Sequence, residues 1–515
     1  MDTKRDEEGR NRSSWSADET IPDRKPLAED LEVDACVVGA GIAGLSTAYM
    51  LAKDGRSVVV LDDGPVAGGE TRRTTAHLSN AIDDRYVEIE RIHGVEGARL
   101  AAESHTAAIE KIAQIVRDEA IDCEFARLDG YLLLGPDDPG DLLAQEEAAA
   151  HRAGLDRVER LPDVPSAPFD SGPCLRFPDQ GQFHPLKYLD GLARAVEKLG
   201  GRIFNGTRVK SIQGGDPARV EAEGGRTVTA RAVVVATNSP INDMYAIHTK
   251  QAPYITYVVA GRVPRGAIPK ALYWDTMDPY HYVRLQDLSD DPAHPEHDLL
   301  IVGGEDHKTG QAEDHEERYR NLEAWARKRF PMMQEVEYRW MGQVQETVDG
   351  LGFLGKNPLD EGNVYIATGD SGMGMTHGTI AGMVISDLVA GRENPWAALY
   401  DPSRKPVKAI NEFVKENANV ARQYADWLTG GDVSSVDQIP DGGGAVIRKG
   451  LSKVACYRDD QGTLHEMSAV CPHLKCIVAW NDDDKTWDCP CHGSRFDRFG
   501  RVVDGPSPVG LPPAE

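Results

Sequence analysis

The chain has 515 residues, a formal net charge of −26 and a sequence pI near 5.0. This length exceeds one ordinary domain, so we expect a large catalytic part with a small appended module. The acidic balance argues against nucleic acid and anionic membranes as partners, because both bind basic surfaces. Eight cysteines are few for this length and indicate no disulfide framework of the secreted type.

Residues 1–30 are charged and polar and contain no apolar segment. This composition is typical of a disordered polar tail, and it fits neither a signal peptide nor a membrane anchor. The longest apolar run, 35–51, is shorter than the roughly 20 residues that span a bilayer, and three glycines interrupt it. We therefore expect a cytoplasmic protein without membrane contact.

Residues 33–62 have the order of elements that a dinucleotide site needs: an apolar strand, a G-x-G-x-x-G turn, a helix, and a second apolar strand ending at an acid. In this pattern Gly39 makes the tight turn and Gly41 lets the backbone approach a pyrophosphate. Gly44 packs the helix on the strand, and Asp62 accepts hydrogen bonds from a ribose. The glycine motif alone is a weak signal, but with all four elements in register it predicts dinucleotide binding.

A loop rich in small and hydroxyl side chains follows at 68–77 and is suited to contact phosphate, ribityl chain or ring edge. It resembles the flavin-contacting loop of the D-amino-acid-oxidase superfamily, which includes amino-acid and sarcosine oxidases and dehydrogenases. The resemblance implies FAD as the cofactor, with contacts from Thr71, Arg72, Thr74 and Thr75. His77 is a weaker candidate for a covalent flavin anchor, because it follows the hydroxyl-rich loop rather than lying within a matching motif.

Later landmarks of the same superfamily recur in order. Val209 lies in a segment that resembles the one whose backbone meets the adenine, and Ala236 ends a strand that resembles the one beside the FAD. Residues 363–375 resemble the closing flavin motif and supply the candidates Gly369, Asp370, Gly372, Gly374 and Met375. A helix that begins near Met375 would point its free N–H groups at the flavin and stabilise the reduced, anionic form. His377, in its first turn, is a candidate for flavin or substrate contact, with a packing role equally open.

The middle of the chain is predicted to hold the substrate. The resemblance implies a second domain with a largely antiparallel sheet over the flavin, and residues 280–284 resemble a strand that lines its active site. Tyr282 and Arg284 are therefore candidate substrate-binding residues. Arg284 could bind a substrate carboxylate through two parallel hydrogen bonds. A solvent-facing strand arginine is the alternative, because the strand register does not follow from the sequence.

The domain organisation follows from these landmarks. We expect a FAD-dependent oxidoreductase domain at 31–430, whose flavin part comes from about 31–110, 187–245 and 341–400 and whose substrate part comes from about 120–186 and 246–340. Residues 406–428 have the apolar spacing of an amphipathic helix. A linker rich in glycine, aspartate and serine follows, with a boundary near Gly431, and short strands then predict a small β module at 431–515.

Two short boxes in this module carry candidate metal ligands. Cys471 and His473 form C-x-H, and Cys489 and His492 form C-x-x-H. Two thiolates and two neutral imidazoles can hold the two irons of a [2Fe–2S] cluster, with a potential above that of an all-cysteine cluster. A structural zinc finger is a weaker interpretation, because it usually pairs two cysteines with two histidines in separate boxes and gives the additional Cys476 and Cys491 no role.

The boxes resemble a Rieske [2Fe–2S] domain of the cytochrome bc type. The resemblance implies that Cys476 and Cys491 form a disulfide that braces the two cluster loops, that 505–508 is the proline loop over the cluster, and that the Ser494 hydroxyl donates to a bridging sulfide. One position departs from the pattern, since Phe496 stands where high-potential members carry a tyrosine hydroxyl. Hydrogen bonds to cluster sulfurs stabilise the reduced state, so we expect a lower potential than in the respiratory relatives.

Together the resemblances predict an α/β, Rossmann-like flavin domain of the D-amino-acid-oxidase type with an interleaved antiparallel-sheet substrate domain, followed by an all-β Rieske domain. A flavin takes two electrons as a hydride and a cluster carries one, so the combination predicts oxidation of a small amine or amino-acid-like substrate with single electrons passed on to an unidentified acceptor. Two alternatives remain open. One is a flavin oxidase that uses oxygen and has a structural or sensing cluster, and the other is an electron-transfer protein fed by a separate reductase.

Overall fold

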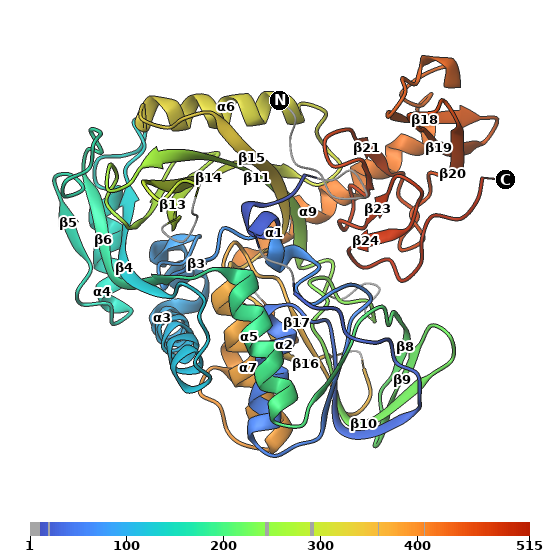
Figure 1. Cartoon of the computed structure of the whole chain (residues 1–515), viewed down its shortest axis with the longest axis horizontal. Coiled ribbons are helices and arrows are strands. Elements are labelled where there is room, and N and C mark those ends of the chain that lie inside the picture. The colour runs from blue at the N-terminus through green and yellow to red at the C-terminus, as the bar shows by residue number, and fades with distance from the viewer. Residues whose placement is uncertain are drawn as a thin grey trace.

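The structure is a computed structural model that describes residues 11–18, 21–242, 247–288, 293–358, 360–405 and 407–514. Its elements form two large sheets with their covering helices and a smaller module at the C-terminal end (Figure 1). None of the helices in these ranges has the length and the apolar character that crossing a bilayer requires.

The first sheet is the predicted Rossmann-like sheet. Its main path runs β16-β17-β10-β1-β2-β7, in which β17, β10, β1, β2 and β7 are parallel, β16 is antiparallel, and a β8–β9 hairpin joins at β10. The central parts of these strands, at 35–38, 58–61 and 232–235, are wholly apolar and buried, as expected where both faces of a sheet are covered. The strand bounds are β1 Leu31–Val38, β2 Val58–Leu61, β7 Arg202–Phe204, β8 Val209–Gln213, β9 Ala218–Ala222, β10 Thr227–Val235, β16 Phe353–Lys356 and β17 Val364–Thr368.

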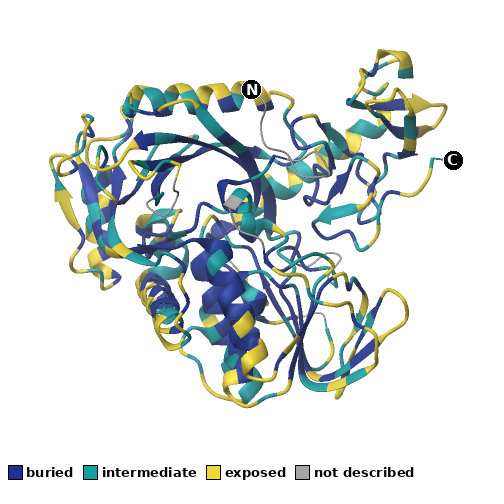
Figure 2. Ribbon diagram, viewed as in Figure 1, coloured by how far each residue is buried: buried dark blue, intermediate teal, exposed yellow. Residues whose placement is uncertain are grey.

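Three helices cover one face of this sheet. They are α2 (Ile42–Lys53), α5 (Pro185–Lys198) and α7 (Gly374–Ala390), and α2 packs between the other two. Their facing sides are buried, as Figure 2 shows. The approach is close where glycines replace side chains, since a Cβ on Gly382 of α7 would lie 2.9 Å from the backbone of Ser46 in α2.

The second sheet has nine strands in the order β15-β11-β14-β13-β12-β4-β6-β3, with β5 on β6. It is mostly antiparallel and forms the predicted substrate domain. The helix α6 (His315–Arg329) lies across its outer face, and the long, Gly94-kinked α3 (Arg85–Asp118) and α4 (Leu142–Arg152) lie toward the flavin domain (Figure 1). The strand bounds are β3 His77–Leu78, β4 Ala126–Leu133, β5 Glu159–Leu161, β6 Cys174–Gln182, β11 Gln251–Pro264, β12 Leu272–Asp275, β13 His281–Asp287, β14 His297–Lys308 and β15 Val336–Thr347.

The C-terminal module contains two small antiparallel sheets, β18-β19-β20 and β21-β22-β23-β24, which share one apolar core, and a second, smaller core includes residues of β18 and β19. The strand bounds are β18 Gly444–Lys449, β19 Ser452–Arg458, β20 Leu464–Ser468, β21 Ala479–Asn481, β22 Thr486–Asp488, β23 Arg495–Asp497 and β24 Val502–Asp504. The module packs beside β11 and β15 of the substrate sheet (Figure 1).

The predicted amphipathic helix at 406–428 is shorter than expected. Its core is α9 (Ile410–Gln423), with 3-10 turns at Val407–Ala409 and Tyr424–Leu428, and Pro406 lies outside the described residues. Much of its apolar face is exposed, including Val407, Ile410, Val414 and Leu428. Val420 and Trp427, by contrast, pack on the apolar core of the C-terminal module.

The predicted disordered tail is wrong for its described part. Residues 14–18 form the short helix α1, and the Trp15 side chain is completely buried. Its indole N–H donates to the Thr74 carbonyl, and its ring packs against His184 and under the Arg284 guanidinium. The Trp15 side chain therefore anchors this segment on the predicted flavin loop. The average composition of the segment does not reveal the effect of one large aromatic residue.

Candidate active site

The predicted FAD-binding residues line one cavity of about 680 Å³ between the two large sheets and the C-terminal module. The exception is Gly44, which lies behind the turn, where a Cβ would collide with the Gly39 carbonyl. The predicted residues in the cavity wall are Gly39, Gly41, Asp62, Thr71, Arg72, Thr74, Thr75, Val209, Ala236, Gly369, Asp370, Gly372, Gly374 and Met375. These residues come from five separate segments of sequence, and the fold brings them together.

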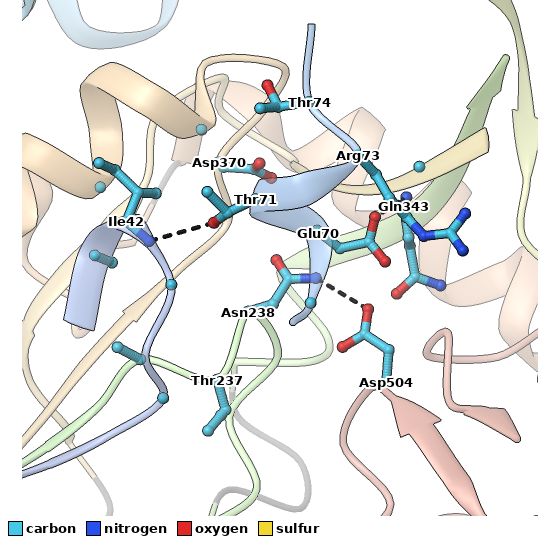
Figure 3. A pocket seen from close by; sticks show the side chains of 18 of the residues that line it. Ile42, Glu70, Thr71, Arg73, Thr74, Thr237, Asn238, Gln343, Asp370 and Asp504 are labelled. Atoms are coloured by element: carbon cyan, nitrogen blue, oxygen red, sulfur yellow. Dashed lines mark hydrogen bonds between the residues drawn. The ribbon is translucent and has the colours of Figure 1, made fainter. Parts of the chain in front are cut away.

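The glycine turn has the geometry of a cradle for a phosphate. Gly39 has φ +106°, and a Cβ there would strike the Ala236 carbonyl, so the turn requires glycine. The Thr71 hydroxyl accepts a hydrogen bond from Ile42 N at 3.2 Å and tethers the flavin loop to the start of α2 (Figure 3). A Cβ on Gly41 would lie 3.1 Å from that hydroxyl. The N-terminus of α2 therefore stays open to an anion.

Asp62 ends β2 and accepts hydrogen bonds from Ala40 N at 2.6 Å and Gly64 N at 2.8 Å. These bonds fix the carboxylate at the cavity wall. Burial and the adjacent charge of Asp63 raise the pKa of Asp62 to about 7. A carboxyl group held at this point can bond the ribose hydroxyls of an adenosine, as the sequence predicted.

His377 lines the cavity, but both of its ring nitrogens already have backbone partners. Nδ1 lies 2.8 Å from the Asp370 carbonyl, and Nε2 accepts from Gly352 N at 3.3 Å. Burial lowers the pKa of His377 to about 4, so the ring is neutral. The arrangement favours the packing role over substrate binding, because the ring holds the turn at 369–374 in place.

Arg284 does not have the position that a carboxylate-binding residue needs. It is buried, it is absent from the residues that line the cavity, and its Nη1 donates to three carbonyls, those of Thr75, Ala76 and Phe183, each at 3.0 Å. The expectation of a substrate carboxylate bound by Arg284 is therefore corrected. The guanidinium braces the end of the flavin loop: Arg284 lies on the same face of β13 as Tyr282, but the flavin loop and the Trp15 ring cover it.

The substrate side of the cavity carries acidic and aromatic side chains that the sequence analysis did not identify, except for Tyr282. Its wall includes Asp83, Thr256, Trp274, Tyr280 and Tyr282. Asp83 lies against the flavin motif, since a Cβ on Gly372 would be 2.5 Å from its Oδ2. Among the described residues, this wall contains no lysine or arginine.

A second carboxyl group, that of Asp306 on β14, lies close to Asp83 and Tyr280 but does not itself line the cavity. The Thr256 and Tyr280 hydroxyls act on Asp306, and that of Tyr280 acts on Asp83, to lower the pKa of each carboxyl group against the effect of burial. Burial, followed by the charges of neighbouring acids, raises the pKa of Asp83 to about 8, and burial raises that of Asp306 to about 7. The sequence signal was weak, because these residues are scattered over four segments and form no motif.

The four predicted cluster ligands converge at one end of the C-terminal module. The imidazoles of His473 and His492 lie 5.1 Å apart between centroids, and Cys471 and Cys489 are hydrogen-bonding neighbours. The Cys489 thiol lowers the pKa of Cys471, and the N–H groups of His473 and Leu474 and the Ser494 hydroxyl act in the same direction against burial. Two thiol sulfurs within a shell of donors, with two buried imidazoles beside them, fit a [2Fe–2S] cluster.

The predicted disulfide between Cys476 and Cys491 is present, and its sulfurs lie within 4.8 Å of the Cys489 sulfur. The expected proline loop also covers the cluster loops, since Ser507 N donates to the Ser494 hydroxyl at 3.2 Å. Phe496 is fully buried in β23 and offers no hydroxyl.

The C-terminal module forms part of the flavin cavity itself. Asp504 enters the cavity wall from this module and pairs with Asn238 at 3.3 Å (Figure 3). Burial, with a smaller contribution from Glu70, raises the pKa of Asp504 to about 8. The residues of the module that line the cavity are Asp497, Arg501, Val502, Val503, Asp504, Gly505, Ser507 and Pro508. The proline loop therefore contacts both the cluster site and the flavin site.

Buried ion pairs hold the module on the flavin domain. Asp484 bonds Arg73 at 3.1 Å and Arg495 at 2.8 Å, and all three side chains are at most 9% exposed. Gln343 of β15 donates to the Gly493 carbonyl at 3.0 Å, next to the ligand His492.

Comparison with known proteins agrees with this geometry. The profile of the FAD dependent oxidoreductase family matches residues 34–388, and that of the Rieske [2Fe-2S] domain matches residues 431–514. The chain belongs to the FAD dependent oxidoreductase family. It is an oxidoreductase that binds FAD and carries a C-terminal Rieske domain for a [2Fe–2S] cluster, which confirms the predicted family, fold class and cofactors.

The similar proteins include two relatives found by sequence and one solved structure. YhfW of Bacillus subtilis, named as a Rieske 2Fe-2S iron-sulfur protein, is 32% identical over 96% of this chain and 95% of its own length. Gamma-glutamylputrescine oxidoreductase of Escherichia coli is 29% identical over 71% of this chain and 85% of its own length. Among solved structures, glycine oxidase from Geobacillus kaustophilus superposes with a TM-score of 0.62 at 19% identity, covering 73% of this chain and 99% of that one. The last likeness shows the fold of the flavin part.

Proposed function

We propose that the chain oxidises a small cationic amine, and that the electrons leave singly through the Rieske cluster to a one-electron acceptor. The observation that carries the substrate class is the wall of carboxyl and aromatic side chains at Asp83, Trp274, Tyr280 and Tyr282. An ammonium group pairs with carboxylates and with aromatic faces. The E. coli relative is named for a substrate that contains such an amine, which supports the same choice.

The residues of the wall bind and orient the substrate. Asp83 lies against the flavin motif at Gly372, so a bound ammonium beside Asp83 places the neighbouring carbon close to the flavin site. A carboxyl group whose pKa is about 8 can also accept the proton that the ammonium must lose before its oxidation. With FAD bound, the flavin site would supply an acceptor for the hydride on the carbon that bears the nitrogen, and the cluster would supply a one-electron carrier.

The position of the Rieske module supports the relay. The loop at 505–508 lines the flavin cavity and is hydrogen-bonded to the cluster loop through Ser507 and Ser494. Electron transfer between the two centres therefore requires no domain movement. The two electrons from each amine leave in two steps, so the final acceptor takes up one electron at a time.

The test is an anaerobic titration of the purified holoprotein with 1,4-diaminobutane and with 4-aminobutanoate, which differ by one charged end group. We expect the diamine to bleach the flavin and then the visible absorption of the cluster, with the amino acid at least tenfold weaker. Preference for the amino acid would overturn the proposed substrate class. Flavin bleaching with an oxidised cluster and prompt peroxide would favour the oxidase alternative, and reduction only by an added reductase would favour the electron carrier.

Two variants distinguish substrate binding by Asp83 from the structural role of Arg284. Asp83→Asn should raise the KM for the diamine about tenfold, since a charge-assisted hydrogen bond contributes roughly 1.5–3 kcal/mol. Arg284→Lys should leave this KM within about twofold and lower the thermal stability, because it loses bonds to three carbonyls. The opposite pattern would restore Arg284 as a substrate-binding residue.

A further inference from the structure

One histidine of the flavin domain lies on the two ligand histidines of the Rieske module. His248 precedes β11 and is 2% exposed. Its ring contacts that of His473 edge-on at 4.9 Å between centroids and that of His492 at 5.8 Å. The ligand rings are themselves only 5% and 6% exposed. The histidine side of the cluster site therefore faces the protein interior.

Neighbouring elements close the rim of this contact. Asn417 of α9 donates to the Thr249 carbonyl at 2.9 Å, and Gln311 donates to the Pro490 carbonyl at 3.0 Å. From the other side, Tyr424 and Trp427 donate to the carbonyls of Leu474 and Lys475 at 2.6 and 3.0 Å. The space left at His248 is about 10 Å³, which is room for one water molecule at most.

We propose that the histidine side of the cluster is where electrons enter from the flavin domain, that His248 is the positioning residue of this contact, and that no small redox carrier reaches the ligand histidines. The inference rests on the proposed relay from flavin to cluster. Each step moves one electron, which oxidises the flavin and reduces the cluster. The acceptor then takes the electron at another surface of the module, because the histidine side is occupied.

The contacts explain why His248 would matter. An edge-on ring restricts the rotation of both imidazoles, and the orientation of a ligand ring affects the electronic structure of the iron that it binds. A ring in van der Waals contact with both ligands also gives a path through packed atoms from the flavin domain. Removing the ring opens a cavity at the interface large enough for water or a planar probe.

The experiment uses the full-length holoprotein with His248→Ala, His248→Phe and, as a control in the same module, His465→Ala. The flavin is reduced anaerobically by light, so no amine substrate is needed, and the cluster is followed by visible absorption and by EPR. We expect His248→Ala to slow cluster reduction at least tenfold and to shift the EPR g values. His248→Phe should restore the rate to within about threefold, and His465→Ala should match the wild type.

A second measurement tests directly whether the histidine side of the cluster is closed to small redox carriers. With the cluster reduced by dithionite, 1,4-benzoquinone should reoxidise it at least tenfold faster in His248→Ala than in the wild type. Equal reoxidation rates, or unchanged EPR and transfer rates in His248→Ala, would overturn the inference. If His248→Ala holds no cluster, His248→Phe and His248→Gln decide the same question. If light-reduced flavin passes no electron to the wild-type cluster, the proposed relay is wrong. The comparison of quinone reoxidation rates still tests whether the histidine side of the cluster is closed.

Discussion

At the scale of single residues, the acidic wall is unusual because the described residues that form it include Asp83 but no lysine or arginine. Asp83 is accessible from the cavity yet surrounded by protein on its other sides, which raises its pKa to about 8. Asp306 has one buried oxygen, Oδ1, without a hydrogen-bond partner. Such groups lower the stability of the charged empty site, and a bound cation would remove that cost.

This arrangement predicts a pH dependence with a definite sign. Asp83 ionises as the pH rises through about 8, so the affinity for a cationic amine should increase between pH 6 and 9. The stability of the empty protein should change the opposite way, because a raised folded pKa gives stability that is complete below pH 4 and is lost as pH rises through 8. Asp83→Asn should flatten both profiles, as measured by the pH dependence of KM and of Tm. Profiles that stay unchanged in the variant would assign the titration to another group.

Phe496 is the residue of the Rieske module whose substitution should change the cluster potential. Its ring is buried in β23, two residues after Ser494, and the resemblance to high-potential Rieske domains implies a hydroxyl donor at this position. Phe496→Tyr should raise the cluster potential by about 40 mV, which corresponds to one hydrogen bond of about 1 kcal/mol to a one-electron centre. Redox titration monitored by EPR measures it. A potential that does not rise would mean that the new hydroxyl does not reach a cluster sulfur.

At the scale of elements, the N-terminal segment acts as a strap across the flavin loop. Ser13 donates to the Arg72 carbonyl at 2.6 Å, Trp15 donates to the Thr74 carbonyl at 2.8 Å, and Asn11 bonds Asp483 of the Rieske module at 2.6 Å. A five-residue helix has little stability of its own, so the packing of Trp15 must hold it in place.

Trp15→Ala should therefore lower the free energy of unfolding by about 3–5 kcal/mol, the usual cost of a large buried aromatic residue. It should also weaken FAD retention, because the flavin loop loses both a packing partner and a donor. Denaturant titration and the rate of FAD loss during dilution are the measurements. Trp15→Phe keeps part of the ring volume but loses the donor. Its stability and FAD retention should lie between those of the wild type and Trp15→Ala. A variant with normal stability would show that the segment only rests on the surface.

At the scale of the whole molecule, the Rieske module is fixed on the flavin domain rather than tethered to it. The link from Arg73 through Asp484 to Arg495 is buried, and Asp504 completes the wall of the flavin cavity. A fixed module would keep the distance between the two cofactor sites constant, so the proposed electron transfer would not wait for a domain to move. A mobile carrier would instead need an exposed histidine side.

Arg73→Gln tests this docking. Asp484 would keep Arg495 as a partner, so we expect a loss of about 1–3 kcal/mol, below the 3–5 kcal/mol typical of a fully broken buried pair. Light-driven reduction of the cluster should slow because the interface loosens. The control is Arg202→Gln, which breaks an exposed pair with Glu29 and should change stability by less than 0.5 kcal/mol. Unchanged cluster reduction in Arg73→Gln would argue that this ion pair does not set the docking.

Contiguous sequence motifs were sufficient to predict the features that depend on local patterns. The strand, turn and helix around Gly39 and the two ligand boxes at Cys471 and Cys489 are contiguous motifs, whose chemistry follows from residue types at fixed spacing. Apolar runs identified most strands and helices for the same reason. These patterns were enough to predict the fold class, the family and both cofactors.

Contacts between distant segments are encoded in the tertiary structure alone. Arg284 and Tyr282 lie on the same face of β13, yet only Tyr282 lines the cavity, because Trp15 and the carbonyls of the flavin loop cover the Arg284 guanidinium. Asp83 and His248 have no motif, and they acquire their neighbours only when separate segments meet. Burial of one side chain, Trp15, ordered a segment whose average composition is that of a tail, because packing energy depends on individual contacts rather than on composition.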